Sequence, residues 1–399
     1  MLKNLKINTK LIAIFLLIGL VPLGTIGVIS LQKSQEALET QAFNQLISLR
    51  DVKKGQIENY FGERLGDVSV LSTNPTVVEA MEAYEAGFED GGVLGSSWRQ
   101  ADETYGRWLT QYEKEYGYYD LFLIAEDGDI IYTVEREPDF GTNIVNGKYS
   151  GENIAELFRK CRGGVAMVDF AAYAPSNGAA ASFVGAPVKD QEGNFIGAVA
   201  LQLPLKRINA IMQERSGLGE SGETYLVGQD NLMRSDSRFS DQPTVLKQEI
   251  NTPTARAGLE GRTGAEIVLD YRGVPVLSAH APVSMAGMEW CVLAEIDEEE
   301  AFAAVNTLQA FILIIAGVMA ALVALIGWLF ARSIARPLAN MANVAKEIAL
   351  GDVDQVITVK SNDEIGMLGN AFNRLIDYMK ELAGHAEKIA DKDLTVEVE

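Results

Sequence analysis

The residues of this chain that could do chemistry are few, and one glycine-rich segment stands out among them. Residues 217–222 (GLGESG) have the G-x-G-x-x-G spacing of a dinucleotide-binding loop. Such a loop binds pyrophosphate only when a strand precedes it and a helix follows, because the helix N-terminus then faces the phosphates. Here the pattern predicts a helix before the segment and a strand after it, and Glu220 adds a negative charge. We therefore interpret the segment as a helix-to-strand turn.

Residues that could form a catalytic or metal centre do not gather in the sequence. The chain has 2 His and 2 Cys, and neither cysteine belongs to a C-x-x-C motif. No phosphate loop, nucleophile elbow or kinase signature occurs. We therefore predict no metal, no cofactor and no enzymatic activity. Cys161 and Cys291 are either buried free thiols or, in an oxidising compartment, partners in a disulfide.

A binding site for a small molecule is the better-supported chemistry. Such sites combine apolar walls with a few fixed polar groups. One stretch is rich in both, and its candidate ligand-binding residues are Tyr132, Tyr149, Asp169, Tyr173, Ser176, Asn177 and Phe183. Asp169 could fix an ammonium group, while tyrosines stack or hydrogen-bond around it. The alternative is that the polar residues only shape a turn and cap backbone N–H groups.

Two uncharged apolar stretches determine where such a site would lie. Residues 11–31 and 308–330 are each long enough for the roughly 20 helical residues that cross ~30 Å of hydrocarbon. A basic start followed by an apolar core is also typical of a signal peptide. The first run is long for one, however, and no clear A-x-A cleavage site follows it. We therefore predict two transmembrane helices with a large exported region between them.

The charges orient these helices. Basic residues precede the first stretch and follow the second, so the positive-inside tendency places both termini in the cytoplasm. The region between the stretches would then be periplasmic or extracellular, with the protein in the inner (plasma) membrane. Most of the net charge of −21 belongs to that region. A nucleic-acid partner is excluded because phosphate binding needs a basic face.

The region between the stretches changes character along its length. Residues 32–75 and, less cleanly, 76–117 show apolar residues at three- and four-residue steps, which predicts helices. From residue 118 short alternating segments separated by Asp/Gly/Asn turns predict antiparallel strands. The pattern then repeats, which predicts two tandem α+β modules, a distal one at about 76–205 and a proximal one at about 214–296.

The segment after the second stretch has a different periodicity. Two seams of apolar residues repeat every seven residues, which is typical of parallel coiled-coil packing. The first seam is Leu338, Met341, Ala345 and Ile348, and the second is Ile365, Leu368, Phe372, Leu375, Met379 and Leu382. Asp363 and Glu364 are predicted to begin the second helix, where carboxylates favour the positive N-terminus.

These features resemble a HAMP signalling domain over residues 331–383. The resemblance rests on a proline shortly after the membrane, a Gly-Asp break and an Asp-Glu-Ile-Gly opening. The residues that match are Pro337, Gly351, Asp352, Asp363, Glu364, Ile365 and Gly366. Residues 384–399 resemble the start of a second HAMP unit. The resemblance implies an all-α parallel coiled coil that transmits a signal.

The exported region, residues 32–300, resembles a double Cache (tandem PAS-like) sensor domain on a long helical stalk. The segments that carry this are DFGTN (139–143), DFAAYAPSN (169–177), GETYLV (222–227) and DYRG (270–273). With the cytoplasmic residues 1–10, the two transmembrane helices and the HAMP domain, the chain resembles the sensory half of a methyl-accepting chemotaxis receptor. Similar front ends occur on histidine kinases and diguanylate cyclases, so those outputs remain alternatives.

The resemblance implies a homodimer that binds a small molecule in its distal module, with the proximal module as a possible spacer. It reaches cytoplasmic kinase machinery only through a helical hairpin that does not occur in these 399 residues. The chain is therefore expected to be a fragment or to have its output beyond Glu399. Amino-acid-binding members carry an Arg-x-Trp-Tyr segment, whereas residues 143–153 contain Lys148 and Tyr149 but neither arginine nor tryptophan. An amine, an amino acid or an organic acid therefore stays open as the ligand.

Overall fold

A computed structural model describes residues 7–358 and 360–390, so the predictions for residues 1–6 and 391–399 lie outside the described residues. The chain divides into two compact units. The first, which we call the sensor unit, is Glu36–Ala303. The second, which we call the membrane–HAMP unit, combines Met1–Gln35 with Ala304–Glu399. Helix α1 (Ile7–Ser72) begins in the membrane–HAMP unit and ends in the sensor unit.

Helices occupy the first part of the sensor unit, as the periodicity predicted. After α1 they are α2 (Pro75–Gly91), α3 (Ser96–Ala101), a π-helical turn η2 (Asp102–Gly106) and α4 (Arg107–Tyr116). Asn74 caps α2, because its side chain accepts a hydrogen bond from the backbone N–H of Thr76 at 2.9 Å, and Pro75 suits the first turn. Gly92, with φ +72°, ends α2 where the sequence showed a Gly-Gly break.

Two antiparallel sheets follow, which agrees with the predicted tandem α+β arrangement. The distal sheet has the order β2-β1-β5-β4-β3 and the proximal sheet the order β6-β9-β8-β7. The distal strands are β1 (Asp120–Ala125), β2 (Ile130–Thr133), β3 (Ala166–Tyr173), β4 (Ala179–Lys189) and β5 (Phe195–Gln202). The proximal strands are β6 (Glu223–Val227), β7 (Gly264–Leu269), β8 (Pro275–Met285) and β9 (Met288–Asp297). The order β1-β5-β4-β3 is thus repeated as β6-β9-β8-β7.

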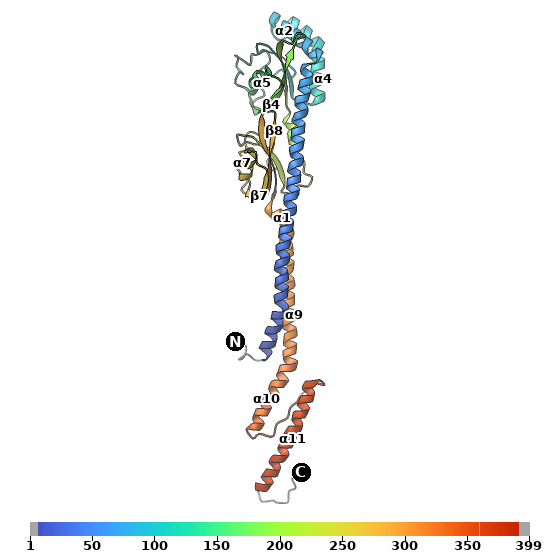
Figure 1. Ribbon diagram of the computed structural model, residues 1–399, viewed down its shortest axis with the longest axis vertical. Helices are drawn as coiled ribbons and strands as arrows, with labels where there is room; N and C mark the ends of the chain where they lie inside the picture. The colour runs from blue at the N-terminus through green and yellow to red at the C-terminus, as the bar shows by residue number, and fades with distance from the viewer. Residues whose placement is uncertain (1–6, 359, 391–399) are drawn as a thin grey trace. The chain divides into compact units, whose positions relative to one another are not determined.

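One face of each sheet packs against the helices at the start of the unit, and α1 runs beside both sheets (Figure 1). Buried Ile57, Phe61 and Val68 of α1 belong to one apolar core with residues of both sheets. Trp290 of the proximal sheet is fully buried there, with its ring centroid 5.4 Å from that of Phe61. The two modules therefore share a continuous core along α1, because apolar residues three and four apart form a stripe on that helix.

A short helix covers the other face of each sheet. Helix α5 (Asn153–Cys161) packs on β3 and β4, and α7 (Pro253–Leu259) packs on β8 and β9. Helix α6 (Leu205–Met212) joins the modules. Cys161 lies in α5 and Cys291 in β9, and both are buried free thiols rather than a disulfide pair. Successive side chains of a strand point to opposite faces of the sheet. They therefore pack alternately into the core shared with α1 and against the short helix on the other face.

The membrane–HAMP unit contains apolar helices at the predicted stretches. Helix α8 (Glu298–Ala301) leads into α9 (Ala303–Phe330). Within the described residues, one part of α1 and one part of the α9 region are long and apolar enough to cross a membrane. Inside this unit the rings of Phe15 and Phe330 lie 5.9 Å apart. Glycines face branched side chains across the contact, as helices that approach closely require.

After α9 come a π-helical segment η3 (Ala331–Ala335), α10 (Arg336–Ala349), an extended connector and α11 (Glu364–Ala390). Asp363 begins α11, since its carboxylate accepts backbone hydrogen bonds from Ile365 at 3.0 Å and Gly366 at 3.2 Å. These bonds and one from the Ser361 side chain lower the pKa of Asp363. A Cβ at position 366 would collide with the Ser361 carbonyl, so glycine is required there.

Other residues of the predicted HAMP signature also have local roles. Pro337 is the second residue of α10, which directly follows the π-helical segment η3, so the helix is irregular where proline removes a backbone N–H. Gly351 adopts φ +97° at the break after α10. The Asp352 carboxylate accepts a backbone hydrogen bond from Asp354 at 3.1 Å, which shapes the turn into the connector. Glu364 is the first residue of α11, and Ile365 packs, partly buried, against the HAMP core.

The core of the HAMP region differs from the two predicted seams. Met341, Ile357 and Ile376 are its buried members, and Ile376 belongs to neither seam. The connector residue Ile357 reaches α11 because Asn373 both accepts from its N–H at 2.9 Å and donates to its carbonyl at 2.8 Å. Leu375 and Met379 of the predicted seam are 53% and 39% exposed. In the part of the chain that the structure describes, Leu368, Leu375, Met379 and Leu382 of this seam are thus exposed, whereas Ile365 and Phe372 pack against the core.

Candidate ligand-binding site

The face of the distal sheet beneath α5 collects buried polar groups. On this face we define the distal polar cluster as Asp120, Asp139, Asn153, Tyr173 and Gln202. Asp120 lies at the start of β1 and Gln202 at the end of β5, where they are cross-strand partners. Asp139 lies in the loop between β2 and α5, and Asn153 begins α5. Polar side chains are thus brought together from β1, β3, β5, α5 and the β2–α5 loop, on a face that also carries a cluster of buried apolar residues.

Asp139 and Tyr173 form the centre of the cluster. The Tyr173 hydroxyl donates a short hydrogen bond to Asp139 Oδ2, and both residues are fully buried. Asp139 Oδ1, by contrast, is buried and accepts no hydrogen bond. Burial raises the pKa of Asp139 above its usual value, although the bond from Tyr173 and the backbone N–H groups of Asp139 and Phe140 oppose this. A buried carboxylate oxygen without a partner is costly, so Asp139 Oδ1 is a candidate acceptor for a donor from outside the chain.

Two further acceptor atoms on this face lack partners. Gln202 Oε1 is buried without a hydrogen bond. Asn153 donates from Nδ2 to the carbonyls of Asp169 at 3.0 Å and Ala181 at 2.8 Å, which ties α5 to the sheet. Its Oδ1 is also buried and unsatisfied. The unsatisfied atoms of the cluster are therefore all oxygens that accept hydrogen bonds.

The electrostatic environment is negative. Burial raises the pKa of Asp120 to about 7, even though this carboxylate accepts backbone hydrogen bonds from Leu121 at 2.6 Å and Val134 at 2.9 Å. The carboxylates of Asp139, Asp120 and Glu152 add to burial in raising the pKa of Tyr173. Among the interactions of the cluster that the described residues make, none involves a lysine or arginine. The arrangement favours a positively charged group with several N–H donors.

The structure brings two of the seven predicted residues into this face. The Tyr173 and Phe183 rings lie 5.1 Å apart in an edge-to-face contact, and Phe183 also contacts Phe122 with ring centroids 5.9 Å apart. Phe183 is the cross-strand partner of Gln202. An apolar wall therefore stands beside the unsatisfied oxygens.

Tyr132 lies away from this centre, and Tyr149 is held by a neighbouring lysine. Tyr132 is the cross-strand partner of Leu123, and strand alternation turns both toward the helices rather than toward α5. Its ring lies 4.7 Å from that of Tyr84, and its hydroxyl donates to the Gly106 carbonyl at 3.3 Å. Tyr149 is buried, and its hydroxyl accepts a hydrogen bond from Lys148 Nζ at 3.0 Å.

Asp169, the predicted anchor for an ammonium group, connects the two modules instead. Its carboxylate forms a bidentate ion pair with the Arg234 guanidinium of the proximal module, and both N–O distances are 3.0 Å. It also accepts a hydrogen bond from Trp290 Nε1 at 3.1 Å. Arg234 additionally pairs with Asp230 and has a side chain only 3% exposed. A cation of the protein itself therefore already occupies this carboxylate.

Ser176 and Asn177 form the turn between β3 and β4. The Ser176 hydroxyl donates to the Glu137 carboxylate. Asn177 is exposed and adopts φ +55°, a left-handed conformation that asparagine tolerates in turns. The turn interpretation that the sequence left open thus describes how both residues are used in the structure.

Sequence reasoning missed the residues with unsatisfied atoms. Asp139 was noticed only as part of a resemblance, and Asp120, Asn153 and Gln202 were not considered. One signal was present. Asp120 is the first residue of the otherwise apolar segment DLFLIA, and Gln202 is the last residue of the otherwise apolar segment FIGAVALQ. A polar residue in a strand that is buried on both faces must have a partner or a function.

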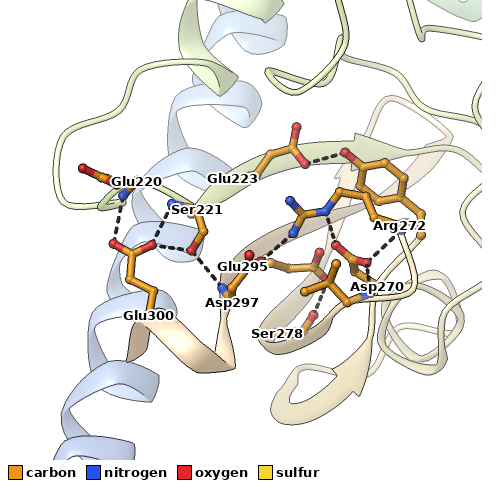
Figure 2. Close-up of polar contacts among 12 residues, drawn as sticks. Glu220, Ser221, Glu223, Asp270, Arg272, Ser278, Glu295, Asp297 and Glu300 are labelled. Atoms are coloured by element: carbon orange, nitrogen blue, oxygen red, sulfur yellow. Dashed lines mark hydrogen bonds and ion pairs between the residues drawn. The ribbon is translucent and has the colours of Figure 1, made fainter. Parts of the chain in front are cut away.

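The proximal sheet carries its own group of buried polar residues (Figure 2). The proximal polar cluster is Glu223, Tyr225, Ser237, Tyr271, Ser278 and Glu295. Glu295 accepts hydrogen bonds from Tyr225 at 2.9 Å and Ser278 at 2.7 Å, and burial raises its pKa to about 7. Glu223 accepts from Ser237 at 2.6 Å and Tyr271 at 2.8 Å. The carboxylate oxygens of this cluster are thus satisfied by the chain itself.

An open cleft of about 670 Å³ lies beside the proximal polar cluster. It is lined by Glu249, Asn251, Thr252, Pro253, Val268, Leu269, Asp270 and Tyr271. The two lining residues that could hold a ligand most firmly are already engaged, because Tyr271 donates to Glu223 and Asp270 pairs with Arg272 at 2.5 Å. The cleft is therefore a second candidate site, in which part of the polar lining is already engaged by the chain.

Comparison with known families identifies this architecture. The Cache domain profile dCache_1 matches residues 32–305, which is more than half of the chain, and the HAMP domain profile matches residues 329–381. The chain belongs to the dCache_1 family. The predicted double Cache fold and the predicted HAMP domain are confirmed by these matches, and in the structure two apolar helices flank the Cache domain.

Curated relatives of this dCache_1 chain are receptors and sensor kinases. It is 28% identical over 207 residues to the methyl-accepting chemotaxis protein PctB of Pseudomonas aeruginosa, covering 49% of this chain and 30% of PctB. It is 25% identical over 268 residues to the probable chemoreceptor y4sI of Sinorhizobium fredii, covering 66% and 34%. It is 24% identical over 188 residues to the sensor protein kinase WalK of Staphylococcus saprophyticus, covering 46% and 31%. The chain spans about a third of the length of these relatives.

Among solved structures, a dCache_1 relative is the ligand-binding domain of the Pseudomonas aeruginosa amino acid chemoreceptor PctB in complex with L-Arg. It is similar with a TM-score of 0.44 and 14% sequence identity, covering 67% of this chain and 98% of that chain.

Proposed function

We propose that this chain is the sensory part of a membrane chemoreceptor that binds a small amine on the α5 face of its distal module. The family match and the relatives named as chemoreceptors support the receptor class. The distal polar cluster supports the location of the binding site. The chain would act as a binding module that returns its ligand unaltered, rather than as an enzyme.

The observation that carries this proposal is the unsatisfied Asp139 Oδ1, fully buried beside Tyr173. An ammonium group placed there would donate one hydrogen bond to Asp139, and Gln202 Oε1 and Asn153 Oδ1 are the other unsatisfied acceptors on the same face of the sheet. The Asp139 carboxylate would balance the positive charge of the ammonium group, and Tyr173 and Phe183 would cover the carbon skeleton of the amine.

Other ligand classes fit this face less well. An organic acid would bring a second negative charge next to the Asp139 and Asp120 carboxylates, and like charges in a buried site repel. An amino acid would leave its own carboxylate without a cationic partner among the described contacts of the cluster. An amine without a carboxylate therefore remains the favoured class of the three that the sequence left open.

We further propose that the sensor unit lies in the periplasm or outside the cell and that the receptor is a homodimer in the inner membrane. The basic flanks of the two apolar stretches support this orientation. The exposed side chains of Leu368, Leu375, Met379 and Leu382 on α11 support the dimer. A second copy of the chain would cover that seam, because a sustained seven-residue repeat is typical of parallel coiled coils.

The output is proposed to be chemotaxis, with a histidine kinase or a diguanylate cyclase as the alternative. Two chemoreceptors among the relatives favour the first, while the similarity to WalK gives the kinase alternative specific support. The same Cache and HAMP domains would serve any of these outputs, because each output needs only a conformational change that passes through the membrane helices.

A thermal-stability screen of the full chain in lipid nanodiscs tests the binding proposal. The panel contains primary amines such as putrescine and ethanolamine, amino acids, organic acids and purines. A binder stabilises the folded state by RT ln(1 + [L]/Kd), about 2.7 kcal/mol at a hundredfold excess over Kd. We expect amines to raise the unfolding midpoint.

The site is tested by two variants in the same screen. Asp139→Asn should remove the shift produced by an amine, whereas Tyr271→Phe in the proximal polar cluster should leave it intact. A shift that survives Asp139→Asn and disappears with Tyr271→Phe would place the site in the proximal module. Stabilisation by organic acids alone would contradict the amine class.

A further inference from the structure

The glycine-rich segment Gly217–Gly222, which has the spacing of a dinucleotide-binding loop, does bind an anionic group in the structure. That group is the carboxylate of Glu300 (Figure 2). The backbone N–H of Glu220 donates to Glu300 Oε1 at 2.9 Å, and the backbone N–H of Ser221 donates to Oε2 at 2.7 Å. The Ser221 hydroxyl donates to Oε2 as well.

The loop is shaped to accept this carboxylate. Gly217 and Gly219 adopt φ values of +80° and +64°, which turn successive N–H groups toward one point. A Cβ on Gly219 would lie 2.3 Å from Glu300 Oε1, so a side chain there would displace the carboxylate. The Arg238 guanidinium donates to the carbonyls of Gly222 and Glu220 from the other side and holds the loop in place.

The segment that carries Glu300 is held at a second point. The Ser221 hydroxyl accepts a hydrogen bond from the backbone N–H of Asp297 at 3.1 Å. The Asp297 carboxylate pairs with Arg272 at 2.6 Å. Both ends of residues 297–300 are therefore fixed to the proximal module, by contacts with residues far away in the sequence. We call the contact of Glu300 with Glu220 and Ser221 the carboxylate clasp.

The position of the clasp in the chain gives it a possible role beyond stability. Glu300 lies in α8, and α9, which contains the second apolar span, begins at Ala303. The next residue, Ala304, already belongs to the membrane–HAMP unit. The clasp thus lies only a few residues before the point at which the chain enters that unit.

We propose that Glu300 is a positioning residue for signal output. By binding the Gly217–Gly222 loop, Glu300 sets the conformation of residues 297–304, which we call the exit segment. In the clasped state the exit segment follows the proximal module, and release of the carboxylate separates the two. The neighbouring Glu299 is exposed and lies in the same helical turn, so it provides a matched control. The proposal extends the proposed receptor function, but its test needs no ligand.

The test is amide hydrogen exchange, measured by mass spectrometry on the full chain in lipid nanodiscs. Glu300→Ala removes both acceptor oxygens, Glu300→Gln removes the charge, and Gly219→Ala disturbs the clasp from the loop side. We expect the amides of residues 218–222 to exchange about tenfold faster in Glu300→Ala, because a hydrogen bond to a charged group is worth about this factor or more. Glu299→Ala should match the wild type.

The decisive readout is exchange in α10 and α11, which a merely structural contact in the sensor unit would not change. A change there in Glu300→Ala and Glu300→Gln, with none in Glu299→Ala, would support the positioning role. Faster exchange confined to residues 218–222 and 297–304 would overturn it, as would the same α10 and α11 change in Glu299→Ala. If Glu300→Ala does not fold, Glu300→Gln and Gly219→Ala decide the outcome. A negative result would leave the ligand-binding proposal untouched, because no ligand is present.

Discussion

In the distal sheet Asp120 of β1 lies opposite Gln202 of β5, and in the proximal sheet Glu223 of β6 lies opposite Glu295 of β9. The repeated strand order thus places a polar pair at the same point of each sheet. In the distal module the surrounding residues leave Gln202 Oε1 and Asp139 Oδ1 without partners. In the proximal module hydroxyl groups satisfy both glutamates.

The difference shows that the same sheet topology can either satisfy its buried polar pair internally or leave acceptors for a ligand. Two carboxylates opposite each other in a sheet repel if both are charged, so the proximal module needs hydroxyl donors and a proton on Glu295 to hold them. That network leaves little for a ligand to add. The distal module has fewer internal donors and retains acceptors that a ligand can satisfy. We therefore expect the distal module to respond to ligands and the proximal module to depend mainly on its internal hydroxyl network and on its contact with residues 297–300.

The largest effect should come from separating the two modules. Trp290 is fully buried and contacts Phe61 of α1 and Phe170 of the distal sheet, with ring centroids 5.4 and 6.1 Å away. Trp290→Ala should lower the free energy of unfolding by about 3–5 kcal/mol, as expected for a large buried aromatic residue. Denaturant unfolding should then show two transitions instead of one. The half-buried Trp108 provides a control, and an equal loss for Trp108→Ala would refute the special role of Trp290.

A smaller effect is expected from Asp139→Asn, and it should separate binding from stability. An amine that binds the wild type should bind the variant about 10–100-fold more weakly, since a charge-assisted hydrogen bond contributes about 1.5–3 kcal/mol. The free energy of unfolding should stay equal or rise, because the variant removes an unsatisfied buried carboxylate. Isothermal titration calorimetry and denaturant unfolding measure the two quantities. A variant that loses stability while keeping its ligand would make Asp139 a structural residue.

Asp169→Asn should lower the stability of the fold but leave amine binding intact, which is the reverse of the result expected for Asp139→Asn. It weakens the ion pair with Arg234, whose side chain is nearly fully buried but keeps Asp230 as a partner. We expect a loss of about 1–2 kcal/mol in the free energy of unfolding, less than for a fully buried pair because the Asp169 side chain is 34% exposed. Amine affinity should change little. Loss of binding without loss of stability would restore Asp169 as the ligand anchor.

The smallest effect concerns pH and the proximal module. Burial raises the pKa of Glu295 from 4.5 to about 7 in the folded state, so the folded protein holds a proton that the unfolded chain releases. The resulting stability is fully present below pH 4.5 and is lost as the pH rises to about 7. Between pH 6 and 7 the loss should be about 1 kcal/mol.

Glu295→Gln tests this prediction, since glutamine cannot release a proton. The unfolding midpoint of the variant should depend less on pH over this interval than that of the wild type. Asp120, whose pKa is also raised to about 7, should leave a residual slope in both proteins. Identical pH profiles for the two proteins would show that Glu295 is ionised in the folded state and that the hydroxyl network alone satisfies it.

Much of the fold followed from short sequence patterns. The apolar stretches, the start of the second HAMP helix at Asp363 and the repeated α+β pattern depend on residues within a few positions of one another. The seven-residue seams were predicted equally directly, but Ile376 was missed because it faces the connector residue Ile357, and that contact depends on how the connector folds back. The residues of the candidate site were predicted less well. Tyr132 and Asp169 have suitable side chains, yet strand alternation and the contact between modules turn them elsewhere.

The sequence by itself determined the class of the protein: a tandem α+β sensor domain between two apolar helices, followed by a HAMP domain. The apolar helices, the α+β modules and the seven-residue seams come from local periodicity and composition, which act over a few helical turns or one strand, and the resemblance to known families supplied the sensor and HAMP assignments. The tertiary structure alone decided which polar atoms remain unsatisfied and which anion the glycine-rich loop holds. Tyr173 meets Asp139 across 34 positions, and Ser221 meets Glu300 across 79. Such contacts depend on the packing of whole elements, because a side chain finds its partner only after the sheets and helices have set its direction.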